Sequence, residues 1–235
     1  MSKRMGFWTS LCLSAWLLCV GSAMAHFVWI ESEPNSAGLL VRSGFGEPGG
    51  WDADLVGRMA GARFWMRTTE GVKPLAMPLG EKQSEYRAEI SGPPPLAILG
   101  ACDFGVIQFG DFPPSWLRYT AKNLVGAPNE WSDKKPADAF RIELFAALDG
   151  DHVQLEALHL GKPLAGATIK ATPPGGGRVE IKTDEQGLAK WPLSAPGLYA
   201  CYVGATTEEA GEKDGKKYEA LKDYTTLTFT LPKSP

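Results

Sequence analysis

His26 occupies the position in this sequence with the most specific chemical potential. It follows Ala23-Met24-Ala25, an A-x-A pattern typical of signal-peptide cleavage. Cleavage after Ala25 would give His26 a free α-amine, which could chelate one metal ion together with the imidazole Nδ1 atom of the same residue. The amine has a pKa of about 8, so a divalent transition metal can displace its proton near neutral pH. We expect His26 to be a metal ligand; the alternative is that it merely begins an edge strand.

Further ligands are harder to choose. The other two histidines lie in one segment, HVQLEALHL, at residues 152–160. In a strand, His152 and His159 point to opposite faces about 23 Å apart, so they cannot share one ion. Either histidine could still contribute to a site, or both could be surface or strand-end residues. The carboxylates that could complete a nitrogen and oxygen site are Glu31, Asp103 and Asp223.

The first 25 residues predict export. Lys3 and Arg4 form a basic start, and the apolar run 11–20 is too short to span a bilayer comfortably. We therefore expect a signal peptide over residues 1–25, a periplasmic or secreted product, and no transmembrane segment in the mature chain. Removal of the signal leaves Cys102 and Cys201. In an oxidising compartment these cysteines could form one disulfide, or they could remain two buried thiols.

The composition is that of a globular protein rich in turns. The chain has 235 residues, of which 44% are hydrophobic and 22% are charged, and these values exclude a disordered or fibrous chain. The 27 glycines and 18 prolines favour short strands and turns over long helices. A net charge of −3 provides no basic surface for nucleic acid, so we expect no nucleic-acid partner.

The elements that must position these residues are predicted to be strands in two domains. Residues 26–135 form an aromatic-rich N-terminal part, in which periodicity does not decide between strand and helix for residues 116–125. Residues 136–235 contain extended segments at a spacing of about ten residues with turns between them, which is typical of a β-sandwich. We therefore expect an all-β protein with two sandwich-like domains.

Several motifs resemble known exported families. The segments GKPLAGATIKATP, KTDEQGLAKWPL and PGLYACYV resemble the carboxypeptidase-regulatory type of immunoglobulin-like sandwich. The segments AHFVWIE, CDFGV, YTAK and YTTLTF resemble, in this order, a bacterial periplasmic family associated with nickel and cobalt uptake. This resemblance implies an accessory role in metal uptake, with a membrane permease as partner. That family often has His before the last of these tyrosines, where this chain has Asp223.

The sequence thus favours a non-enzymatic protein that binds a nickel, cobalt or copper ion through His26. The chain has no HExxH, GxSxG or CxxC motif. One alternative is a cell-envelope interaction module without metal. Another is a copper-dependent oxidative enzyme acting on glycans, because such enzymes also use an N-terminal histidine. An aromatic surface for a glycan could come from four tryptophans, Trp51, Trp65, Trp116 and Trp131, although core packing also explains them.

Overall fold

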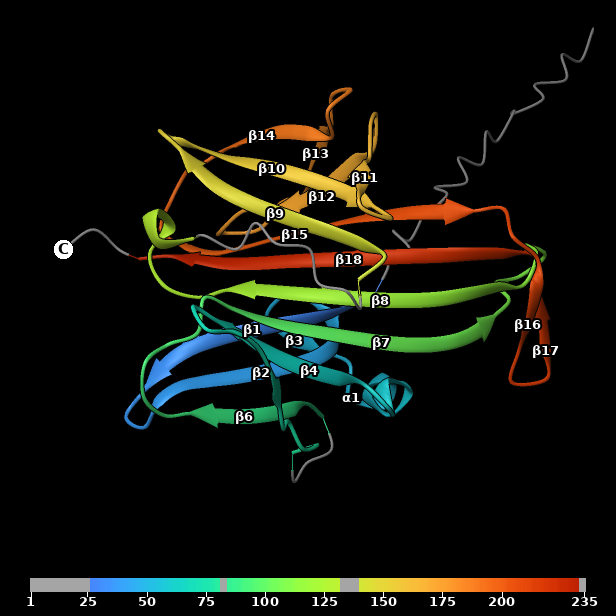
Figure 1. Ribbon diagram of the computed structural model, residues 1–235, viewed down its shortest axis with the longest axis horizontal. Helices are drawn as coiled ribbons and strands as arrows, with labels where there is room; N and C mark the ends of the chain where they lie inside the picture. Colours follow the sequence, from blue (N-terminus) through green and yellow to red (C-terminus); the bar gives the residue numbers. More distant parts are fainter. Residues whose placement is uncertain (1–25, 81–83, 132–139, 233–235) are drawn as a thin grey trace, which may run out of the picture.

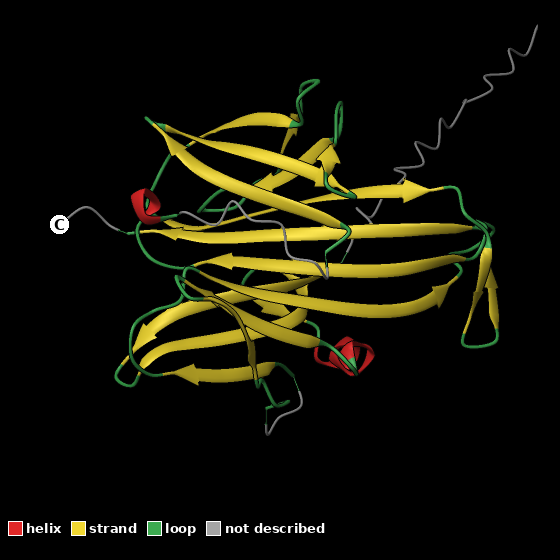
Figure 2. Ribbon diagram, viewed as in Figure 1, coloured by secondary structure: helices red, strands yellow, loops and turns green. Residues whose placement is uncertain are grey.

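The computed structural model describes residues 26–80, 84–131 and 140–232, and its fold is all-β, as predicted (Figures 1 and 2). Helix is limited, within these ranges, to α1 (Ala53–Val56) and the 3-10 helices η1 (Gly57–Met59) and η2 (Pro128–Glu130). No helix in the described ranges is long and apolar enough to cross a membrane. The expected signal peptide and the expected domain boundary at residues 135 and 136 lie outside the described residues.

A central eight-stranded sheet runs through both halves of the chain. Its strand order is β13-β12-β15-β18-β8-β7-β4-β5. The junction between the halves is the parallel pairing of β8 with β18, while the other neighbours in this sheet are antiparallel. The strands are β4 (Arg63–Thr68), β5 (Gly71–Leu75), β7 (Ala97–Ile107), β8 (Ser115–Leu124), β12 (Thr168–Thr172), β13 (Val179–Lys182), β15 (Gly197–Thr207) and β18 (Ala220–Leu231).

Two smaller sheets cover opposite faces of the central sheet (Figure 1). The N-terminal half provides β1 (Phe27–Asn35), β2 (Gly38–Glu47), β3 (Gly50–Trp51) and β6 (Tyr86–Ile90). The C-terminal half provides β9 (Ile142–Asp149), β10 (His152–His159), β11 (Lys162–Pro163) and β14 (Leu188–Pro192). A separate hairpin, β16 (Gly211–Lys213) and β17 (Lys216–Tyr218), extends from the end of the molecule.

Alternation along β18 shows that the arrangement has three layers. Leu227 and Phe229 pack in the core that includes β9 and β10. Thr226 and Thr228 alternate with these two residues along the strand, and their hydroxyls donate hydrogen bonds to backbone carbonyls of β1. Because successive side chains of a strand point to opposite faces, the two outer sheets lie on the two sides of β18.

Each interface has its own apolar core. The core beneath β9 and β10 contains aliphatic residues and the aromatic trio Trp191, Tyr199 and Phe229. The core beneath β1 and β2 is more aromatic and includes Phe27, Trp29, Phe45 and Tyr119. The two apolar cores thus lie on the two sides of one central sheet to which both halves of the chain contribute strands, and the expected resemblance to a regulatory-type sandwich stays a prediction.

A buried ion pair joins β8 to β9. The Nζ atom of Lys122 lies 2.6 Å from Oε1 of Glu143, and the two side chains are only 1% and 3% exposed. The Lys122 ammonium also lies 4.0 Å from the centre of the Phe145 ring. Burial lowers the pKa of Lys122 to about 8, although the Glu143 carboxylate opposes this shift.

This ion pair predicts that removing one of the two charges destabilises the protein more than removing both. Glu143→Gln leaves the Lys122 ammonium without its carboxylate, and we expect a loss of about 3–5 kcal/mol in the free energy of unfolding. The double variant Lys122→Met/Glu143→Leu removes both charges and should lose less than the single variant. Urea denaturation monitored by tryptophan fluorescence measures both values. A double variant that is less stable than Glu143→Gln would contradict this expectation.

Candidate functional site

His26 lies beside the carboxylate of Asp52, a residue distant from it in sequence. It directly precedes β1, and its Nε2 atom is 4.0 Å from Oδ2 of Asp52. The imidazole also stacks against Phe45 of β2, with ring centroids 6.1 Å apart. Each member of the His26–Asp52 pair has a side chain that is 36% exposed, so the pair is accessible from solvent.

Local hydrogen bonds hold Asp52 in this position. Asp52 is the N-cap of α1, and its Oδ1 atom accepts a hydrogen bond from the backbone N–H of Asp54. Its own backbone N–H donates to the carbonyl of Phe45 at 2.8 Å. These bonds fix one carboxylate oxygen on the helix and leave Oδ2 directed toward His26. An Asp before ADLV is a recognisable N-cap signal, but its contact with His26 depends on the β2–β3 turn and was not predicted.

His26 also lines a cavity of about 380 Å³. The cavity is lined by residues from β1, β2, α1, η1, β7, β8 and β18, and most of them are apolar. His26 thus lies at an apolar pocket, with the Asp52 carboxylate beside its ring.

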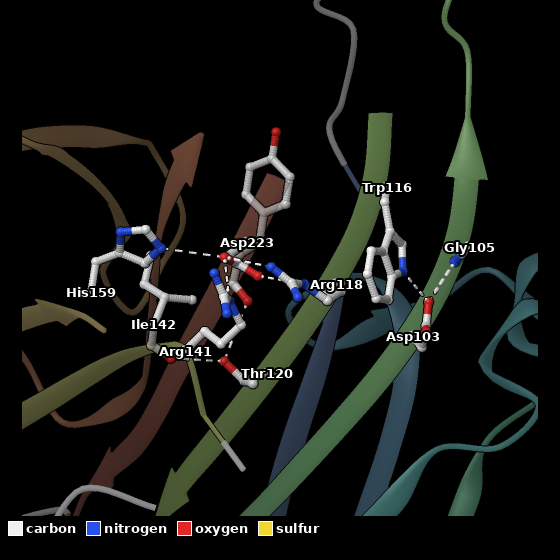
Figure 3. Close-up of polar contacts among 10 residues, drawn as sticks. Asp103, Gly105, Trp116, Arg118, Thr120, Arg141, Ile142, His159 and Asp223 are labelled. Atoms are coloured by element: carbon white, nitrogen blue, oxygen red, sulfur yellow. Dashed lines mark hydrogen bonds and ion pairs between the residues drawn. The ribbon is translucent and has the colours of Figure 1, made fainter. Parts of the chain in front are cut away.

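Glu31 and Asp103 are placed apart from His26, each with partners of its own. Glu31 accepts a hydrogen bond from the backbone N–H of Gly49 at 2.6 Å. Burial raises the pKa of Glu31, and this hydrogen bond opposes the rise. Asp103 accepts hydrogen bonds from the Trp116 indole at 2.6 Å and from the Gly105 backbone at 3.0 Å (Figure 3).

The carboxylate of Asp223 is surrounded by three basic side chains, an arrangement that the sequence did not predict (Figure 3). Its two carboxylate oxygens accept from Arg118 at 2.8 and 3.0 Å, and Oδ2 lies 3.4 Å from Nε of Arg141. The Nε2 atom of His159 lies 3.3 Å from the same oxygen. Asp223 and His159, two expected ligands, are therefore brought together, but two guanidinium groups adjoin them. Those positive charges would repel a metal cation.

The remaining expected ligand, His152, begins β10 and contacts Asp151 through its Nδ1 atom. Across residues 26–80, 84–131 and 140–232, no three His, Cys, Asp or Glu side chains form a group that could hold a metal ion. Among the described side chains, the nearest carboxylate to His26 is that of Asp52, and the other expected ligands take part in separate contacts.

The tryptophans considered for a glycan surface are divided between the two sides of the central sheet. Trp131 is buried and packs against Phe229, with ring centroids 4.7 Å apart. Trp51 packs against the other core and donates its indole N–H to Glu85. These residues serve packing and local hydrogen bonding, and they do not line one face.

In the structure the two cysteines are separate buried thiols, one of the two alternatives that the sequence leaves open. Cys102 belongs to β7 and Cys201 to β15, and both are free. The strands β8 and β18 lie between them, so their Cα atoms are separated by at least about 14 Å, whereas a disulfide needs less than about 7 Å. They also belong to different cores, on opposite faces of the sheet.

The sequence matches no protein-family model and no curated protein. The relationship to a nickel and cobalt uptake family therefore stays a prediction, and the function must be argued from the geometry.

The Asp223 cluster gives a prediction for stability. Asp223 is 3% exposed and neutralises Arg118 at the junction of β8 and β18. Asp223→Asn should therefore lower the free energy of unfolding by about 3 kcal/mol, because the guanidinium groups lose a buried partner. The exposed Asp149–Lys190 pair provides the control, since Asp149→Asn should cost less than about 1 kcal/mol. Similar losses in the two variants would contradict the buried role of Asp223.

The thiols give a prediction for pH. Burial raises the pKa of Cys102 to about 12 and also raises the pKa of Cys201, whereas an unfolded thiol ionises at about 8.5. Above that pH the unfolded chain releases protons that the native chain retains, so stability falls as pH rises. We expect a loss of about 2–4 kcal/mol between pH 7.5 and pH 10 from the two thiols together. The variant Cys102→Ala/Cys201→Ala should lose correspondingly less.

The measurement for the thiols is urea denaturation of both proteins at the two pH values under reducing conditions. As a check on the starting state, a thiol reagent should count two free thiols in unfolded protein that was never reduced. Equal pH sensitivity of the wild type and the double variant would show that these thiols do not ionise on unfolding.

Proposed function

We propose that this protein, after cleavage at Ala25, is an exported binding protein for a divalent transition metal. The α-amine and the Nδ1 atom of His26 hold the ion, which is nickel, cobalt or copper. The observation that carries the proposal is the Asp52 carboxylate, 4.0 Å from the Nε2 atom on the opposite side of the ring.

The two ring nitrogens of His26 have different roles in this proposal. Nδ1 is close enough to the α-amine of its own residue to form a compact chelate ring. Nε2 then carries the remaining proton, and a carboxylate beside a ligating histidine commonly accepts this proton. Such a carboxylate fixes the tautomer and the ring orientation and makes the ligating nitrogen more basic. Asp52 is suited to this role because α1 and the Phe45 carbonyl already hold it in place.

The chemistry of the donors sets the choice of metal. An amine and an imidazole are borderline nitrogen ligands, which favour copper and nickel over magnesium or calcium. Copper binds most tightly to such donors, so supply rather than intrinsic affinity would decide which ion is carried. The resemblance to an uptake family supports a role in delivering the ion to a membrane permease.

The first test compares a free with a blocked N-terminus. The mature chain beginning at His26 should bind one Cu(II) or Ni(II) ion, as measured by titration calorimetry or native mass spectrometry. In an uncleaved fusion that joins a Gly-Ser linker to His26, the amine becomes an amide and the affinity should fall at least about a hundredfold, because the chelate is lost. Equal affinity of the two forms would refute the chelate. No binding by either form would favour an interaction module without metal.

The second test addresses Asp52. Asp52→Asn should weaken metal binding about 10–100-fold, the usual effect of losing the carboxylate behind a ligating histidine. Asp54→Asn removes the same charge from the same short helix, where the side chain is exposed, and should change the affinity less than about threefold. If the two variants bind metal equally well, Asp52 does not orient His26.

A further inference from the structure

The cavity beside His26 has the size and walls of a small-molecule site. Its volume of about 380 Å³ falls within the range of about 300–1,000 Å³ that is common for ligand pockets. The walls are formed mainly by apolar side chains, among them Phe27, Phe45, Leu55, Phe104, Leu117 and Tyr119. An apolar body of about one or two rings would fit this space.

The aromatic wall is held in place by its own contacts. Phe45 stacks on Phe104 with centroids 4.5 Å apart, and both rings meet Tyr119 edge to face. Tyr119 in turn stacks against Tyr224 of β18 at 5.5 Å. Because aromatic side chains have few rotatable bonds and these are packed against each other, the pocket is formed before a ligand arrives.

Two cations line the same pocket without a carboxylate partner. Arg58 comes from η1 and Lys222 from β18, and Lys222 shares its face of the strand with Tyr224. Within the described part of the chain, neither has a carboxylate oxygen within 4.0 Å, whereas Arg42 on β2 and Arg87 on β6 are paired with Glu33 and Glu89. Arg58 is exposed and Lys222 is half-buried, so the two positive charges are placed at the mouth of an apolar pocket, where they would attract an anion.

The tyrosines supply further hydrogen-bonding groups. Tyr119 and Tyr224 line the pocket, and their hydroxyls make no hydrogen bond with another described residue. Burial raises the pKa of both phenols, so they stay protonated and able to donate. Donors without acceptors in the protein are suited to an oxygen-bearing ligand.

We propose that this pocket binds a small organic carboxylate whose aromatic or alkyl body rests on the Phe45–Phe104–Tyr119 wall and whose charged group is held by Arg58 and Lys222. This site is distinct in chemistry from the chelate proposed at His26, since it takes an anion through guanidinium and ammonium groups and needs no metal. A neutral or cationic molecule of the same shape would leave both cations uncompensated.

The first experiment uses two probes with the same body. Mature protein in the presence of a chelator is titrated with 1-naphthoate and with the uncharged 1-naphthamide, and binding is measured by calorimetry. Naphthoate should bind at least about tenfold more tightly, because only it forms charge-assisted hydrogen bonds with the two cations. Equal affinity of the two probes, or no binding of either, would overturn the proposal. Since no metal is present, the result is independent of the His26 chelate.

The second experiment assigns the site. Arg58→Gln and Lys222→Gln should each weaken naphthoate binding about tenfold and leave naphthamide within about twofold. Lys162→Gln is the matched control, because Lys162 is exposed on β11 in the outer sheet across the central sheet and should have no effect. Phe104→Ala should weaken both probes together. Thermal unfolding of each variant confirms that it is folded. An equal loss in Lys162→Gln would show that the attraction is general and not local.

Discussion

The parallel pairing of β18 with β8 is the constraint on which the rest of the structure depends. β18 is the last strand of the described residues, yet it lies in the middle of the central sheet between β15 and β8. Its register is fixed by the Asp223–Arg118 ion pair and by the hydrogen bond from the Asn123 amide to Thr228, which join directly paired residues. Both outer sheets attach at this junction, since Thr226 donates to the β1 backbone and Thr120 to the Ile142 carbonyl of β9.

The strands could be predicted from the sequence better than their arrangement. Turn residues and alternating patterns identified an all-β chain, but residues 116–125 could not be assigned. The structure gives the reason: both faces of β8 are covered, so nearly all of its side chains are buried and the alternation that marks a half-exposed strand is absent. The three-layer arrangement, with one core on each face of the central sheet, depends on pairing between strands far apart in the sequence. No local sequence pattern encodes that pairing.

The candidate site was predictable only in part, for a similar reason. His26 could be singled out because the A-x-A pattern of residues 23–25 precedes it, whereas Asp52 lies 26 positions away and reaches it through the fold of β2 and β3. Asp223 was expected to be a carboxylate available for a metal. Its pairing with Arg118 and Arg141 could not be foreseen, because these residues lie 105 and 82 positions away in sequence.

The central position of β18 also determines how the protein must fold. Until the last strand has emerged, β15 and β8 each present an unpaired edge, and neither core has its full wall. Contacts between residues about 200 positions apart, such as Thr226 with Val28, give the chain a high contact order and a correspondingly slow search for the native state. The N-terminal half therefore cannot complete its core until β18, which follows it by about 100 residues, is available to pair with β8.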